Sequence, residues 1–140
     1  MAAGTGRNVI LLPIFPGYAR AIIEGRKKVE FRKLNIPVNI ENVVIYSTSP
    51  EKKIVGSFSV SKITKATPEK LWQDFKDIGY VDKESLYKYY SGHEYGLAIH
   101  IGKVKRVNKP FPLAKIKRQN PPQSFTYLDN EILERVKSFS

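Results

Sequence analysis

The stretch Gly25-Arg-Lys-Lys-Val-Glu-Phe-Arg32 joins the end of a predicted helix to the start of a predicted strand. Residues 16–24, just ahead of it, carry apolar side chains at helical spacing, and the first glycine of the stretch suits the left-handed residue that closes many helices. Within the stretch, apolar and charged side chains then alternate, as they do in a half-buried strand. This alternation places Glu30 and Arg32 on one strand face, with Lys27 at the turn before them.

These three charged side chains could carry chemistry together. A carboxylate can accept a hydrogen bond from the exocyclic amine of a nucleobase, while the ammonium and the guanidinium donate to carbonyl or phosphate oxygens. The same residues could instead form an ordinary surface ion pair, which contributes little to stability. The spacing alone leaves both interpretations open.

The rest of the chain alternates strands and helices without the regular repeat of a doubly wound sheet. We expect strands at residues 8–14, 26–32, 43–46, 53–63 and 95–107, with a bulge at Gly102. A helical insertion is expected at about residues 67–92, where Thr67 and Asp82 can cap two short helices, and a last helix is expected at 130–139. These patterns predict one α+β domain over residues 8–140, with a flexible segment at residues 1–7. Its mostly antiparallel, barrel-like sheet would have short flanking helices; an open α+β sandwich is the alternative.

The composition excludes several classes of protein. The 140 residues include no cysteine, which excludes disulfide scaffolds, zinc ribbons, iron–sulfur sites and thiol nucleophiles. The histidines, His93 and His100, lack the spacing of metal ligands, so we expect no metal and no cofactor. The apolar run at residues 9–15 is far shorter than a membrane span, and no export signal precedes it. We therefore expect a cytoplasmic protein without a membrane partner.

The charge is strongly positive and unevenly distributed. The chain has 24 Lys and Arg against 13 Asp and Glu, a formal net charge of +11. Residues 95–128 contain seven bases and no acid, and residues 20–33 contain six bases and two acids, whereas residues 69–94 contain six acids and four bases. Clustered cations release counterions together when they meet phosphates, so a nucleic-acid partner is favoured over a charge that only maintains solubility.

Four segments resemble one known family. The pattern Gly25-x-Lys27-x-x-Glu30-x-Arg32 resembles the GxKxxExR signature of the ASCH domain, and Leu11-Leu-Pro-Ile-Phe-Pro-Gly-Tyr-Ala19 resembles the family's usual entry into the first helix. Tyr46-Ser-Thr-Ser-Pro50 and Pro121-Pro-Gln-Ser-Phe125 extend the likeness over roughly residues 9–128. The resemblance implies a PUA-like β-barrel with a cleft, beside the helix after the first strand, that takes RNA or a modified base.

The resemblance also implies which residues form the cleft. Lys27, Glu30 and Arg32 would line it, and Phe125 would either stack on a base or pack a loop onto the core. The other expected ligand-binding residues are a neighbouring lysine, four hydroxyl residues and an amide: Lys28, Ser47, Thr48, Ser49, Ser124 and Gln123. The polyanion would be steered by Lys103, Lys105, Arg106, Lys117 and Arg118.

Two alternatives to an RNA-binding module remain open, and the patterns do not set the oligomeric state. If the protein is an enzyme, Lys27 and Glu30 would be the catalytic pair that handles protons, in an amidohydrolase of acylated nucleosides or in a ribonuclease. The hydrolases of this family place a threonine where this chain has Glu30, so Ser47 or Thr48 would have to supply the missing hydroxyl. A regulatory protein that meets other proteins through the acidic insertion is the remaining hypothesis.

Overall fold

The structure, a computed structural model, describes residues 8–139, so the predicted flexible segment 1–7 lies outside the described residues. The strands are β1 (Val9–Ile14), β2 (Val29–Arg32), β3 (Asn42–Ser47), β4 (Lys53–Ala66), β5 (Gly96–Phe111) and β6 (Thr126–Tyr127). The helices are α1 (Pro16–Ile23), α2 (Pro68–Phe75), α3 (Lys83–Tyr89) and α4 (Asn130–Lys137), with a short 3-10 helix, η2 (Leu113–Ile116).

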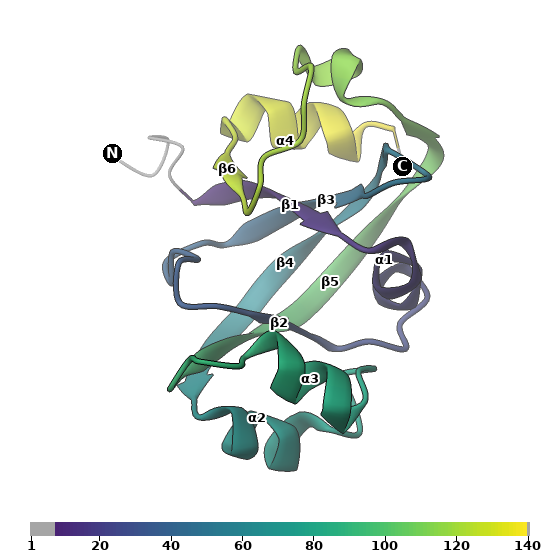
Figure 1. The fold of residues 1–140 in the computed structure, drawn as a ribbon. Helices are drawn as coiled ribbons and strands as arrows, with labels where there is room; N and C mark the ends of the chain where they lie inside the picture. The colour runs from purple at the N-terminus through teal and green to yellow at the C-terminus, as the bar shows by residue number, and fades with distance from the viewer. Residues whose placement is uncertain (1–7, 140) are drawn as a thin grey trace.

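The six strands form one curved sheet in the order β2-β5-β4-β3-β1-β6. Every neighbouring pair is antiparallel except β1 and β3, which run parallel. The sheet curls into half a barrel, and its two longest strands, β4 and β5, cross the whole molecule (Figure 1). The predicted α+β class and the mostly antiparallel, PUA-like sheet are confirmed.

The long strands differ from the prediction at their ends. The strand expected at residues 53–63 continues to Ala66, and the one expected at 95–107 continues to Phe111. The two strands pair with each other along most of this length, which extends both beyond the alternating part of the sequence. Their register shifts where Phe58 faces Val104 and Val60 faces Ile101, so the bulge expected at Gly102 is confirmed.

Local signals set the helix ends that surround the site. Gly25 follows α1 with a φ of 81°, the left-handed conformation expected there. The Thr67 hydroxyl accepts a hydrogen bond from the Lys70 N–H, and the Asp82 carboxylate accepts one from the Ser85 N–H. These two caps begin α2 and α3 within the predicted helical insertion.

Three apolar clusters bury the two faces and one end of the sheet. Because β1 is buried on both faces, Leu12 packs toward α1 while Leu11 packs toward α4 on the other side. The third cluster joins Phe31 of β2 to Leu71 of α2 and Leu86 of α3. It holds the helical insertion at the end of the molecule opposite α4 (Figure 1).

Candidate functional site

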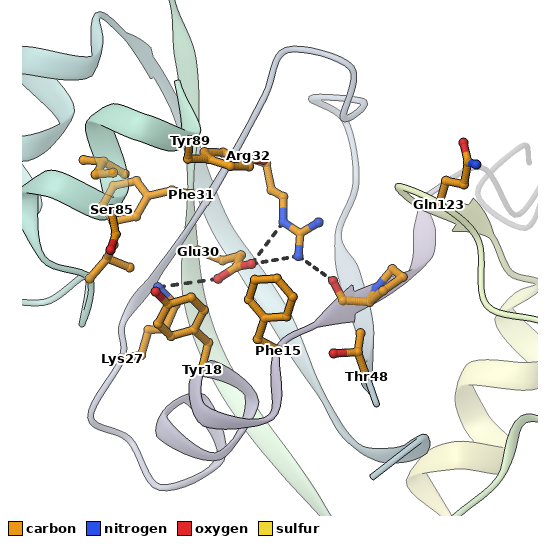
Figure 2. Close-up of a pocket in the computed structure, with 13 residues that line it drawn as sticks. Phe15, Tyr18, Lys27, Glu30, Phe31, Arg32, Thr48, Ser85, Tyr89 and Gln123 are labelled. Atoms are coloured by element: carbon orange, nitrogen blue, oxygen red, sulfur yellow. Dashed lines mark hydrogen bonds and ion pairs between the residues drawn. The ribbon is translucent and has the colours of Figure 1, made fainter. Parts of the chain in front are cut away.

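A cavity of about 440 Å³ lies where β2, α1, α3 and the end of β1 meet. Elements far apart in the sequence line it: Pro13, Phe15, Tyr18, Lys27, Glu30, Phe31, Arg32, Thr48, Val81, Ser85, Leu86, Tyr89 and Gln123. Its size falls within the range of pockets that hold small organic ligands. Figure 2 shows the charged residues of β2 between α3 on one side and Phe15, Thr48 and Gln123 on the other.

The floor of the pocket is a network of charges around Glu30. The guanidinium of Arg32 donates from Nε to Glu30 Oε2 at 3.0 Å, and its Nη2 lies 2.9 Å from the same oxygen. Nη2 also donates to the carbonyl oxygen of Pro13 at 2.5 Å (Figure 2). These bonds fix the plane of the guanidinium but use only Nε and Nη2. Within the described residues, no hydrogen bond engages Nη1, so its N–H groups remain to meet a ligand.

Lys27 is enclosed rather than exposed in the pocket. Its side chain is 1% exposed, and its Nζ lies 3.5 Å from Glu30 Oε1. The ammonium donates to the carbonyl oxygen of Gly79 at 2.5 Å and lies 4.9 Å from the ring centre of Tyr18 and 5.3 Å from that of Phe31. Burial lowers the pKa of Lys27, and the charge of Glu30 opposes that shift.

Aromatic rings form much of the remaining wall. The side chain of Phe15 is 69% exposed although it lines the cavity, and its ring centre is 6.2 Å from that of Tyr18. Tyr89 of α3 lines another side, and Lys33 Nζ lies 4.8 Å from the centre of its ring. Burial raises the pKa of the Tyr18 phenol, which therefore stays uncharged at neutral pH. Flat π surfaces next to an uncommitted guanidinium suit a planar ligand that carries oxygen acceptors.

The ASCH domain family model matches residues 12–111, a segment that contains the whole charged network and the α2–α3 insertion. The chain belongs to the ASCH domain family. This confirms the relationship that the Gly25–Arg32 signature indicated. The ASCH signature thus contributes three neighbouring charges to the pocket floor, on β2 and the turn before it.

The relatives that this chain matches differ widely in length. The ASCH domain-containing ribonuclease of Zymomonas mobilis subsp. mobilis is 27% identical over 139 residues, 96% of this chain and 93% of that protein. The ATP synthase subunit alpha of Ureaplasma parvum serovar 3 is 28% identical over 123 residues, and there the chain spans only 15% of the relative's length. The crystal structure of ASCH from Zymomonas mobilis superposes with a TM-score of 0.85 at 27% identity, covering 94% of this chain and 95% of that one.

The structure brings together five of the residues expected at the site of this ASCH domain. Lys27, Glu30, Arg32, Thr48 and Gln123 all line the cavity. Glu30 and Arg32 lie on one strand face, as the alternation predicted. Of the hydroxyls considered as a substitute nucleophile, Thr48 lies in the cavity and Ser47 does not.

Several other expected residues lie near the cavity without lining it. Ser47 is completely buried and Ser49 is exposed. Ser124 accepts a hydrogen bond from the side-chain amide of Asn35 at 2.7 Å. Phe125 packs against the core, with its ring centre 5.5 Å from that of Tyr127, so the packing alternative describes it.

The lysines and arginines that were expected to bind or steer the polyanion are spread over other surfaces. Exposed side chains outside the cavity are those of Lys28, Lys103, Lys105, Arg106 and Lys117. Arg106 lines a second, smaller cavity of about 150 Å³ between α1 and the ends of β4 and β5. Arg118 follows η2 and is partly buried. These residues can act on a polyanion only at a distance from the pocket or along a strand that continues out of it.

Sequence reasoning missed the wall that α3 provides. Val81, Ser85, Leu86 and Tyr89 enter the pocket from the helical insertion, and none of them is among the residues that the sequence predicts at the site. One feature of the sequence indicates this wall. Residues 86–90 carry more apolar and aromatic side chains than one buried stripe of so short a helix can hold, so some of them must point away from the core.

Two other findings concern metal ions and membranes. In residues 8–139, no group of three or more His, Cys, Asp or Glu side chains is placed to hold a metal ion. No helix within the same residues has the length and apolar character needed to cross a membrane.

Proposed function

We propose that this ASCH domain binds single-stranded RNA and takes one nucleotide of the strand into the pocket. The observation that carries the proposal is the uncommitted Nη1 of Arg32 beside the rings of Phe15, Tyr18 and Tyr89. Single-stranded RNA presents unstacked bases, which aromatic side chains hold by stacking, and oxygens, to which a guanidinium donates.

The roles of the charged groups follow from their hydrogen bonds. Arg32 donates to a phosphate or carbonyl oxygen of the bound nucleotide, because its Nη1 is the donor left available. Glu30 orients Arg32 through Oε2. Its Oε1, which among residues 8–139 has only the 3.5 Å contact with Lys27, can accept from a base amine. The bases of the 103–118 segment steer the RNA, as the net charge of +11 favours.

The choice of RNA over DNA is supported by one relative. The Zymomonas mobilis protein, which matches this chain over 93% of its own length, is named a ribonuclease. A site that accepts RNA is therefore expected in a chain of this length and fold.

A salt titration with a fluorescent single-stranded RNA tests the proposal. We expect the binding constant to fall steeply as salt rises, with a slope of about 0.7 for each phosphate that a cation neutralises. We expect Arg32→Met to weaken binding about tenfold or more, since hydrogen bonds to charged groups contribute about 1.5–3 kcal/mol. RNA affinity that is independent of salt, or unchanged in Arg32→Met, would contradict the proposal, and equal affinity for DNA of the same sequence would contradict the preference for RNA.

Strand cleavage is the second candidate function, and the name of the Zymomonas mobilis relative favours it. In that reaction the 2′-hydroxyl attacks the adjacent phosphorus, the bond to the 5′-oxygen breaks, and the leaving oxygen takes a proton. Glu30 and Lys27 would be the pair that handles the protons, and Arg32 would stabilise the charge on the phosphoryl oxygens. End-labelled RNA incubated with wild type and with Glu30→Gln tests it. Cleavage that Glu30→Gln abolishes supports an enzyme, and intact RNA in both leaves a binding module.

Hydrolysis of an acylated nucleoside is tested in parallel with acetylated cytidine. Thr48 is the hydroxyl in the cavity that could act as a nucleophile. Release of acetate by the wild type and not by Thr48→Ala would establish this activity in place of strand cleavage.

A further inference from the structure

We infer that Lys27 is a positioning residue: its ammonium fastens the connector between α2 and α3 to Glu30, and so holds the α3 wall of the pocket over Arg32, which makes the contact with RNA. The connector comprises residues 76–82. This inference rests on the proposed function, because it assigns RNA contact to Arg32 and positioning to Lys27 within the same site.

The surroundings of Lys27 leave it little capacity for a ligand. Its side chain is 1% exposed, against 16% for Arg32. A carbonyl oxygen of the connector, a carboxylate oxygen of Glu30, and the rings of Tyr18 and Phe31 together surround the ammonium. An ammonium has three N–H donors, and these neighbours satisfy its charge from several sides.

The connector is attached to β2 at the same place by two further contacts. The Lys28 N–H donates to the carbonyl oxygen of Ile78 at 2.7 Å. Gly79 lies so close to Phe31 that a Cβ atom on it would come within 2.5 Å of Phe31 Cε2. The hydrogen bond from Lys27 therefore reaches the connector where Gly79 is tightly packed against Phe31. No free space is left there into which the connector could shift.

The α3 wall depends on that junction because the connector leads directly into it. Asp82, at the end of the connector, caps α3 through the Ser85 N–H. Val81, Ser85 and Tyr89 then face the cavity from the connector and the helix. Figure 2 shows Lys27 on the opposite side of Glu30 from Arg32, so the two cations hold the carboxylate from two directions. Loss of Lys27 would release both the connector and one side of Glu30.

The first experiment needs no RNA and compares hydrogen exchange in wild type, Lys27→Met and Lys70→Met. Lys70 is the matched control, since it is a 61%-exposed lysine on α2 outside the pocket. The reporters are the amides of Ile78 and Gly79, which donate to Phe75 O. We expect exchange at both to rise about tenfold or more in Lys27→Met and to stay unchanged in Lys70→Met. Unchanged exchange in Lys27→Met would overturn the inference.

The second experiment is a double-mutant cycle on RNA affinity with Glu30→Gln. If Lys27 acts through Glu30, Lys27→Met weakens binding about tenfold in the wild-type background and less than about twofold in the Glu30→Gln background. An equal loss in both backgrounds would show that Lys27 acts independently of Glu30, and would overturn the inference that it fastens the connector to Glu30. Should the methionine variant not fold, Lys27→Gln removes the charge with a polar side chain and enters the same cycle.

A pH profile separates charge-dependent positioning from mere packing. Glu30 of β2 and the Tyr18 phenol of α1 face the ammonium, and the charge of Arg32 acts on it from the far side of Glu30 (Figure 2). Because burial lowers the pKa of Lys27, wild type should lose RNA affinity more steeply than Lys27→Met as the pH rises from 8 toward 10. Parallel profiles would contradict the inference. A wild type that binds no RNA would refute the proposed function instead, and hydrogen exchange would still decide whether Lys27 holds the connector.

Discussion

Replacing Phe15 by alanine should weaken RNA binding without weakening the fold. The Phe15 side chain is 69% exposed, so its removal takes little apolar surface out of the core. Its backbone carbonyl, which accepts the Ala19 N–H at 2.8 Å, is retained at the start of α1. A base stacked on one aromatic ring contributes about 1–3 kcal/mol, so we expect affinity for single-stranded RNA to fall about 5- to 150-fold. Fluorescence anisotropy at fixed salt measures the affinity, and urea unfolding measures the stability.

Val38→Ala is the matched control. Val38 is 70% exposed, almost the same as Phe15, but it does not line the pocket. Val38→Ala should bind RNA as tightly as the wild type does. The free energies of unfolding of both variants should lie within about 0.5 kcal/mol of the wild-type value. If Phe15→Ala binds RNA as tightly as Val38→Ala, the ring does not stack on a base and the assignment of the pocket is refuted.

Three further predictions concern the stability of the pocket. Burial lowers the pKa of Lys27 below its ordinary 10.5, so in the pH range just below 10.5 the unfolded chain binds more protons than the folded one. The free energy of unfolding of wild type, relative to that of Lys27→Met, should therefore rise with pH in this range, by at most about 1.4 kcal/mol per pH unit. Urea unfolding from pH 8 to 10 measures both free energies. A difference between the two proteins that stays flat or falls would contradict this. Gly79→Ala should lower the free energy of unfolding by about 1–3 kcal/mol and reduce RNA affinity, because its Cβ would come within 2.5 Å of Phe31 Cε2; a variant as stable as wild type would show that the junction yields. Tyr90→Phe should cost about 1–3 kcal/mol in thermal unfolding, since the hydroxyl donates to Arg32 O at 2.9 Å, and an unchanged midpoint would mean that water replaces the bond.

The parts of the fold that depend on neighbouring residues could be predicted from the sequence. Gly25 marked the end of α1, and the alternation after it placed Glu30 and Arg32 on one face of β2. The caps at Thr67 and Asp82 located α2 and α3. In each case the deciding interaction joins residues within a few positions of one another, so the pattern in the sequence contains it.

The parts that depend on distant residues could not be predicted in the same way. Lys27 bonds to Gly79, 52 positions away, and nothing near either residue indicates the other. The two-residue strand β6 exists because Thr126 and Tyr127 pair with β1, not because they alternate. Likewise, β4 and β5 extend beyond their alternating segments because each supplies the other's hydrogen-bond partners.

The division of the pocket between the sheet and the α2–α3 insertion makes one wall of it replaceable. Glu30 and Arg32 belong to β2, which pairs with β5 and keeps its register whatever α3 presents. Ser85 and Tyr89, by contrast, lie on the exposed surface of a seven-residue helix, where side chains can change without disturbing the core. A library randomised at those two positions would therefore alter the shape and hydrogen-bonding character of the wall while leaving the guanidinium in place. Under the proposed function, the domain is a scaffold from which variants that bind different nucleotides could be selected.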